Sequence, residues 1–81
     1  MCIMYKWKIS ATKFYDGRAI HSSMASQPKE SGMSYDEARA NGEMYAGDFI
    51  KVFKYDRVTL AIMEYDEAGK MIHAEYDYMG A

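Results

Sequence analysis

Residues 58–78, VTLAIMEYDEAGKMIHAEYDY, decide the fold of this 81-residue chain. The two flanks, Val58–Tyr65 and Lys70–Tyr78, are rich in β-branched and aromatic residues, which favour strands. The linking segment begins with Asp and ends with Gly, a pattern typical of a type I turn closed by a glycine bulge. The stretch therefore predicts a β-hairpin that pairs Asp66 with Lys70.

The turn also determines which side chains share a face, because side chains alternate along a strand. Counting outward from the turn places Ile62 opposite Ala74. This register gathers one apolar face, which comprises Val58, Leu60, Ile62, Ile72, Ala74 and Tyr76. Slipping by one residue would scatter these side chains, so the turn and the hydrophobic pattern agree. We expect this face to be core.

The opposite face of the predicted hairpin is mixed in character. It carries Thr59, Ala61, Met63, Tyr65, Met71, His73, Glu75 and Asp77. These side chains are too apolar near the turn for an ordinary solvated face, and too acidic near the chain end for a core. The face is therefore either a half-exposed sheet surface or a contact surface for a partner or a second copy.

A second hairpin is expected near the start of the chain. Residues 3–11 alternate between apolar and polar, which predicts a half-buried strand with its odd-numbered side chains inward. Asp16-Gly17 is a strong hairpin signal because both residues accept positive φ. The return strand would run over about 18–25. A two-residue loop would place Ile20 opposite Lys13, a poor match that predicts a bulge or an early strand end.

A helix is expected after this hairpin. Ser34 and Glu37 have the spacing of a capping box, in which each side chain bonds the backbone amide of the other residue. The helix would end at Asn41-Gly42, or run on to Ala46-Gly47. Residues 49–55, FIKVFKY, are typical of a strand, which a tight turn would join to the main hairpin.

These elements predict a single α+β domain covering residues 1–81. It would hold a small antiparallel sheet of about five strands in the order β–β–α–β–β–β, with one short helix packed on it. The pattern is compatible with one sheet or with two layers. A chain of this length buries roughly 60–65% of its unfolded surface, so its core is thin and leaves little room for a deep substrate pocket.

The cysteine content and the absence of long apolar runs bear on the compartment. Cys2 is the only cysteine, which excludes an intramolecular disulfide. The sequence shows neither a secretory signal nor an apolar run long enough to span a membrane. These features are typical of a reducing compartment, and we expect a cytoplasmic protein that does not bind membranes.

The sequence shows no motif that carries enzyme chemistry. It contains neither a phosphate-binding loop nor a nucleophile elbow. His73, Glu75 and Asp77 alternate along one strand and could contribute to a metal site, but any strand gives such spacing. Glu64, at the rim of the apolar face, lacks the second carboxylate that acid–base catalysis would need. We therefore expect no catalytic residues, no metal and no cofactor.

The abundance of tyrosine and methionine favours a protein-interaction module. The chain has eight of each, and both residue types make adaptable contacts at interfaces. The predicted partner surface is the mixed face of the main hairpin, represented by Met63, Tyr65, Met71, His73, Glu75 and Asp77. Its acids would orient a partner with a basic surface. Small inhibitors of nucleic-acid-handling complexes, of the kind that phages and mobile elements encode, share this size and composition. Homodimers through this face or through sheet edges are also compatible with the thin core.

The uneven charge of the chain supports an alternative function. The net charge is −2, yet residues 1–18 hold four bases against one acid. A nucleic-acid-binding module would use these bases, Lys6, Lys8, Lys13 and Arg18, beside strand aromatics. The overall acidity and the predicted inward orientation of Trp7 weigh against this alternative. A small-molecule-binding or enzymatic domain is the third possibility.

Overall fold

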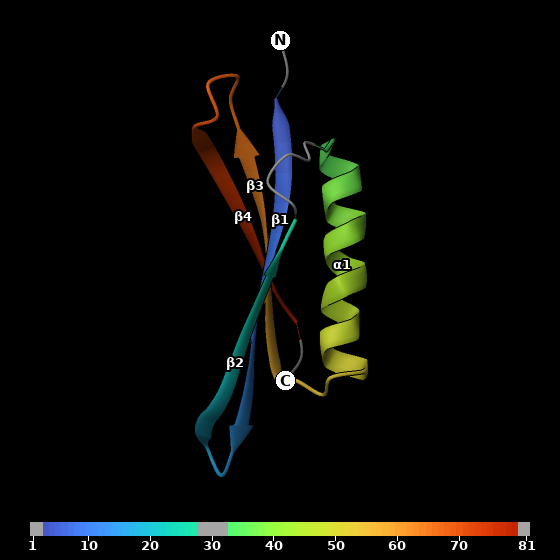
Figure 1. Cartoon of the computed structure of the whole chain (residues 1–81), viewed down its shortest axis with the longest axis vertical. Helices are drawn as coiled ribbons and strands as arrows, with labels where there is room; N and C mark the ends of the chain where they lie inside the picture. The colour runs from blue at the N-terminus through green and yellow to red at the C-terminus, as the bar shows by residue number, and fades with distance from the viewer. Residues whose placement is uncertain (1–2, 28–32, 80–81) are drawn as a thin grey trace.

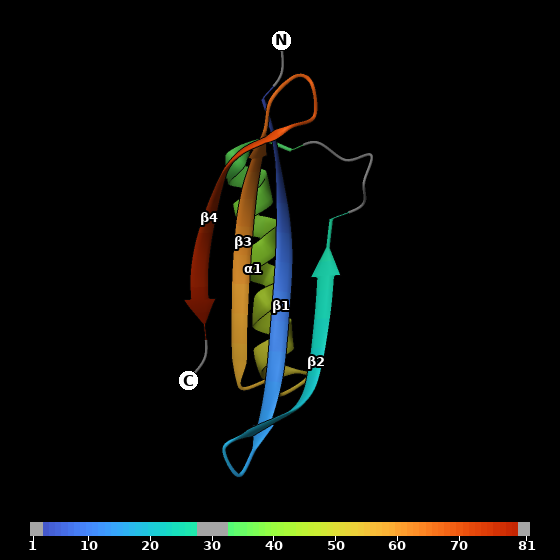
Figure 2. The same ribbon diagram turned by 90° about the vertical axis from the view of Figure 1, so that its left-hand side faces the viewer.

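The computed structural model describes residues 3–27 and 33–79 of the chain, and it shows one antiparallel sheet with one helix. The elements follow in the order β1 (Met4–Tyr15), β2 (Arg18–Ser26), α1 (Tyr35–Lys51), β3 (Arg57–Tyr65) and β4 (Met71–Met79). Their order in the sheet is β2-β1-β3-β4, so β1 and β3 are central. Helix α1 runs along one face of the sheet (Figure 1), and Figure 2 shows the four strands side by side in front of it. The predicted α+β class is confirmed, with four strands rather than five.

The missing strand is the predicted one at residues 49–55, which was wrong. Helix α1 continues to Lys51, because Phe49 and Ile50 pack against the core from the last helical turn. Val52 is the C-cap of the helix, and Lys54, in the turn that follows, adopts a left-handed conformation with φ of 60°. The backbone amide of Tyr55 then donates to the carbonyl of Phe49 at 2.9 Å, which turns the chain toward β3. Tertiary packing here overrides the β propensity of the segment.

The start of α1 agrees with the sequence. Ser34 is the N-cap, and its hydroxyl accepts from the amide of Glu37 at 3.2 Å. The carboxylate of Glu37 accepts in turn from the amide of Ser34 at 3.2 Å, which completes the capping box. Neither predicted end of the helix was right, because Asn41-Gly42 and Ala46-Gly47 both lie inside it.

A stripe of small residues lets α1 lie close to the sheet. Ala38, Gly42 and Ala46 are spaced four apart, are buried, and form the face of the helix that meets β1 and β3. A Cβ atom at Gly42 would lie 2.6 Å from Leu60 Cδ1. The close approach of α1 to the sheet therefore requires a residue without a side chain at position 42. The sheet side of the core comprises Trp7, Ile9, Ala11, Val58, Leu60 and Ile62.

The β1–β2 hairpin has the predicted turn and the predicted bulge. Asp16 and Gly17 have φ of 54° and 78°, and they join the paired residues Tyr15 and Arg18. The register shifts between Lys13 and the next residue, as the poor match at this point predicted. The odd-numbered side chains of β1 face the helix, which confirms the predicted orientation of the strand.

The β3–β4 hairpin has the predicted turn but not the predicted register. The amide of Asp66 donates to the carbonyl of Lys70 at 2.9 Å, and Tyr65 pairs with Met71 as expected. A β-bulge follows directly, so that the next pair is Glu64 with His73. One extra residue in β4 reverses the faces of all its later side chains relative to β3.

The bulge exchanges the faces of the acidic and the aromatic residues of β4. Glu75 pairs with Ile62 on the face that α1 covers, and Asp77 also points to that face. Tyr76 pairs with Ala61 on the opposite face and is 57% exposed. The expectation that Ile72, Ala74 and Tyr76 share the apolar core face was therefore wrong.

Candidate functional site: the open face of the sheet

The sheet has one face that no described element covers. Helix α1 lies on the other side, and Figure 2 views the sheet from the uncovered side. We call this surface the open face and define it by strand side chains that point away from α1. From the strand registers, it comprises Met4, Lys6, Lys8, Ser10, Thr12 and Phe14 of β1, Ala19, Ser22, Met24 and Ser26 of β2, Arg57, Thr59, Ala61, Met63 and Tyr65 of β3, and Met71, Ala74, Tyr76 and Tyr78 of β4.

The open face is basic although the chain is acidic. Lys6, Lys8 and Arg57 lie on it, and the strands contribute no Asp or Glu to it. The carboxylates of β3 and β4 (Glu64, Glu75 and Asp77) all lie on the helix side of the sheet. The net charge of −2 thus conceals a face whose charged strand residues are all cations, contributed by the central strands β1 and β3. Such a surface attracts anions.

Two of these cations lie over aromatic rings of the same face. The Nζ atom of Lys6 is 5.4 Å from the ring centroid of Tyr65. The guanidinium carbon of Arg57 is 4.8 Å from the ring centroid of Phe14. Cation–π contacts at exposed sites contribute about 0.5–1 kcal/mol each and hold charge and ring together. The open face therefore presents combined cationic and aromatic units rather than isolated charges.

The aromatic side chains of β4 enlarge this surface. Tyr76 is 57% exposed and Tyr78 is 77% exposed, while Met24 on β2 at the other side is 61% exposed. Exposed rings on an uncovered sheet face are available for stacking, since their neighbours in the strand point to the opposite face. The open face thus carries four aromatic rings (Phe14, Tyr65, Tyr76 and Tyr78) across three of its strands.

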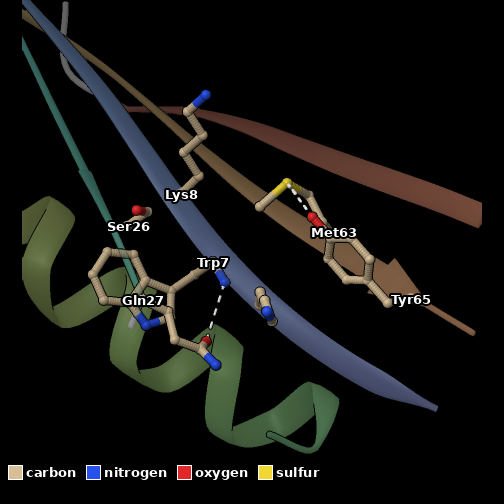
Figure 3. A pocket seen from close by; sticks show the side chains of 7 residues that line it. Trp7, Lys8, Ser26, Gln27, Met63 and Tyr65 are labelled. Carbon is tan, nitrogen blue, oxygen red and sulfur yellow. Dashed lines mark hydrogen bonds between the residues drawn. The ribbon is translucent and has the colours of Figure 1, made fainter. Parts of the chain in front are cut away.

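A shallow groove of about 560 Å³ lies at the end of the open face where β2 stops. Lys6, Trp7, Lys8, Ser26, Gln27, Met63 and Tyr65 line it. Figure 3 shows the hydroxyl of Tyr65 directed toward the sulfur of Met63, at 3.7 Å. The groove places two lysines and a tyrosine around one depression.

Gln27 forms the edge of this groove, because it hydrogen-bonds to β1 directly after β2 ends at Ser26. Its side-chain Oε1 accepts from the backbone amide of Trp7 at 3.4 Å (Figure 3), and its own amide donates to the carbonyl of Trp7 at 3.3 Å. Gln27 is only 6% exposed. Met33 continues the pairing with the backbone of Tyr5. The edge of β1 is therefore satisfied here, and the groove has a fixed border.

The six residues of the predicted partner surface are divided between the two faces. Met63 and Tyr65 lie on the open face, and Met71 pairs with Tyr65 at the end of the hairpin. Glu75 and Asp77 lie on the helix side, as does His73, which pairs with Glu64. The bulge in β4 is the physical reason, since the predicted register did not include it.

The acids of β4 are bound within the molecule. The guanidinium of Arg39 forms ion pairs with Glu75 and Asp77, and it also bonds Glu43 at 3.1 Å. The hydroxyl of Tyr35 donates to Glu75 at 2.6 Å. These groups connect α1 to the edge strand β4. One arginine faces three carboxylates here, so the cluster keeps a net negative charge, but Glu75 and Asp77 are held by bonds to α1 rather than directed only to solvent.

The same cluster shifts two pKa values. The hydrogen bond to Glu75 and burial both raise the pKa of the Tyr35 phenol. Burial opposes the charge on Arg39, but its hydrogen bond with Tyr35 and the attraction of Asp77 raise the pKa of its guanidinium overall. Both shifts favour the protonation states in which the cluster is bonded, a phenol that donates and a charged arginine.

The basic residues predicted for nucleic-acid contact are also divided. Lys6 and Lys8 lie on the open face, as their pairing with Met63 and Ala61 shows. The Nζ atom of Lys13 lies 5.1 Å from the ring centroid of Tyr55, on the helix side. Arg18 lies at the exposed tip of the β1–β2 hairpin. The structure therefore does not bring all four together.

Arg57 joins the two lysines instead, and the sequence did not identify it. It was placed in a tight turn, whereas it is the first residue of β3 and lies opposite Thr12. Tyr76 and Tyr78 were also missed, the first because it was assigned to the core face. Their position on the open face follows from the bulge in β4, which places Glu75 and Asp77 on the side of Arg39.

The described residues contain no apparent metal site and no membrane span. No three His, Cys, Asp or Glu side chains within residues 3–27 and 33–79 are grouped so that they could hold a metal ion. The helix of the described chain is neither long nor apolar enough to cross a membrane.

No protein-family model, curated protein or solved structure matches this chain. Its function is therefore inferred from the chemistry of the open face alone.

Proposed function

We propose that the protein is a non-catalytic binding module that holds single-stranded nucleic acid across the open face of its sheet. One observation carries this proposal: an uncovered sheet face combines three cations and four aromatic rings with no carboxylate from its strands. The lysines and the arginine would contact phosphates, and the rings would stack on bases.

The dimensions of the open face suit a short stretch of single strand. Lys6 lies six residues from Thr12, the partner of Arg57, and this separation corresponds to about 20 Å along β1. Single-strand-binding surfaces commonly accommodate about 4–16 nucleotides. The cations are therefore far enough apart to contact several successive phosphates rather than one.

A duplex suits this surface less well. Four strands spaced about 4.8 Å apart give a face about 14 Å wide between the axes of its outer strands. The major groove of B-DNA is about 12 Å wide and admits a helix or a two-stranded ribbon. The exposed tyrosines also need unpaired bases on which to stack. The width and the chemistry both favour a single strand.

Self-association through the open face is disfavoured by its charge. Two copies placed face to face would bring Lys8 and Arg57 of each chain toward a surface whose strand residues include no Asp or Glu. Burial of like charges costs free energy unless they are paired. The charge of this face therefore favours an anionic occupant.

The second candidate is the occlusion of a nucleic-acid-handling protein, as the composition predicts. Met24, Met63 and the exposed tyrosines favour it, because these residue types form adaptable interface contacts. The charge of the open face requires an acidic partner surface, in place of the basic one that the sequence indicated. Either function suits the cytoplasm, where the single Cys2 would stay reduced.

Fluorescence anisotropy with labelled single strands of about 12 nucleotides tests the proposal. The double variant Lys6→Ala/Lys8→Ala is expected to bind at least about tenfold more weakly. Its salt slope should fall by about 1.4, since each single-strand phosphate contact contributes about 0.7. The matched control is Lys13→Ala/Lys54→Ala, which removes the same charge away from the open face and should change affinity less than about twofold.

Two results would overturn the proposal. One is equal loss of affinity in both double variants, which would mean that only net charge matters. The other is the absence of binding by the wild-type protein to any single-stranded DNA or RNA at low salt. Binding of an acidic protein surface that survives nuclease treatment would then favour the second candidate.

A further inference from the structure

Strand β4 leaves one of its two edges unpaired. It is the last strand in the order β2-β1-β3-β4, and no described element lies beside its outer edge (Figure 2). Its nine residues, MIHAEYDYM, contain neither the Lys nor the Pro that commonly protect exposed edges. The unpaired amides and carbonyls of such a strand are a template for another strand.

Ion pairs between α1 and β4 hold the edge strand in place, so that its unpaired backbone groups are in a fixed position. Arg39 bonds Glu75 and Asp77 of β4, so the outer strand is fixed to the helix as well as to β3. Helix α1 packs against the central strands β1 and β3, and β4 is an edge strand of the sheet. The other edge strand, β2, runs with β1 beyond the end of the helix (Figure 1) and has less support.

A strand can pair with a copy of itself around a two-fold axis perpendicular to the sheet. The two strands are then antiparallel, and one residue of β4 lies on the axis opposite its own copy. Because side chains alternate, this residue and its neighbours keep the same face in both copies. The choice among possible axis positions is then decided by which side chains are brought opposite each other.

Charge excludes two of the three registers nearest the middle of the strand. An axis at Glu75 places two carboxylates opposite each other. An axis at Tyr76 places Glu75 opposite Asp77 twice. Like charges directly opposite are destabilising in a sheet.

An axis at Ala74 avoids this conflict. It places His73 opposite Glu75 twice, which is a hydrogen-bonding pair. It also brings Ile72 opposite Tyr76 twice, and these side chains are 52% and 57% exposed in the single chain. This register thus combines backbone pairing with the His73–Glu75 and Ile72–Tyr76 contacts.

We propose that two copies of this chain associate through β4, antiparallel and centred on Ala74, to form one continuous sheet. The perpendicular axis keeps both helices on one side and both open faces on the other. The seam brings only uncharged residues such as Ala74 and Tyr76 together on the open side. This association is independent of the proposed function, but it would double the surface available to a nucleic acid.

Cysteine cross-linking tests the register, in a Cys2→Ser background that removes the native thiol. Ala74→Cys should form a disulfide-linked dimer under mild oxidation at least about tenfold faster than Ala40→Cys, a matched change on the exposed surface of α1. Ser22→Cys, exposed on β2, reports pairing of the other edge. Faster cross-linking of Ser22→Cys than of Ala74→Cys would overturn the proposal.

A charge variant tests the pairing without cross-linking. His73→Glu places two carboxylates opposite each other twice, and it should raise the dimer dissociation constant at least about tenfold. His21→Glu is the control, since His21 is also an exposed histidine on an edge strand. Circular dichroism verifies that both variants fold. Light scattering should give twice the mass of the 9.3-kDa chain for the wild type. A monomer at high concentration, or equal dimers in both variants, would contradict the proposal.

Discussion

The two faces of the sheet are built from alternate residues of the same strands, yet they have opposite chemistry. The covered face holds Leu60 and its apolar neighbours, and at its margin Arg39 compensates two acids. The open face holds cations and rings without strand carboxylates. The comparison shows that strand register decides which side chains are available to a partner. A single bulge in β4, between the Tyr65–Met71 pair and the Glu64–His73 pair, sets the face on which each later residue of β4 lies.

Alanine substitutions at two neighbouring residues, one on each face, should show the largest difference in their effect on stability. Leu60 is fully buried, so Leu60→Ala should lower the free energy of unfolding by about 2–5 kcal/mol. Thr59 lies next to it on the open face, and Thr59→Ala should cost less than about 1 kcal/mol. Urea denaturation measures both values. Similar losses in the two variants would mean that the open face is also packed.

The two arginines should separate stability from binding. Arg39→Met leaves Glu75 and Asp77 uncompensated beside each other, and it should lower stability by about 1–2 kcal/mol. Arg57→Met should change stability by less than about 1 kcal/mol, because it removes only an exposed cation–π contact with Phe14, but it should weaken binding of single strands. Denaturation and anisotropy on both variants give the four numbers. If one variant lost both stability and single-strand binding, the two faces would not have separate roles.

Two glycines of α1 should respond in opposite directions to the same change. At Gly42 a Cβ atom meets Leu60 and the Cβ atom of Trp7, so the cost of overpacking exceeds the gain in helix propensity. Gly42→Ala should therefore lower stability by about 1 kcal/mol net. At Gly47 nothing lies within 4 Å of the added atom, and Gly47→Ala should raise stability by up to about 1 kcal/mol. Thermal unfolding distinguishes them, and a stabilising Gly42→Ala would refute the close helix–sheet approach.

The smallest expected effect is the pH dependence that Tyr35 gives to the stability of the fold. Its pKa is raised above the ordinary value of 10.0, so the folded state favours the neutral phenol. The stability that Tyr35 contributes is therefore fully present below pH 10.0 and is lost as the pH rises through its higher folded pKa. Relative to Tyr35→Phe, the wild type should lose stability in that alkaline range. A constant difference between the two proteins would show that the hydrogen bond to Glu75 is weak.

The sequence correctly predicted the turns and the helix start, because each of these depends on a few residues that are close together in the chain. Asp16-Gly17 and the Asp66–Gly69 turn require specific backbone conformations, and Ser34 with Glu37 satisfies the amides of a helix start. Each of these signals lies within four or five residues. They were therefore readable without knowledge of the rest of the chain.

The features that failed depend on residues distant in the chain. Phe49 and Ile50 are helical because they pack on the sheet, although their segment has strand propensity. The bulge in β4 brings Glu75 and Asp77 to Arg39, which lies 36 residues before Glu75 in the chain. The open face was consequently not identified, since Tyr76 was assigned to the core face and Glu75 and Asp77 to the opposite one.

Mapping the contact surface by NMR tests the central claim most directly. A short single-stranded oligonucleotide is added to the labelled protein, and amide shifts are followed in β1, β3 and α1. The account predicts that the shifts concentrate around Lys6, Lys8 and Arg57, with the exposed side of α1 unchanged. Shifts confined to α1, or no shifts at saturating oligonucleotide, would contradict the assignment of the open face as the binding site.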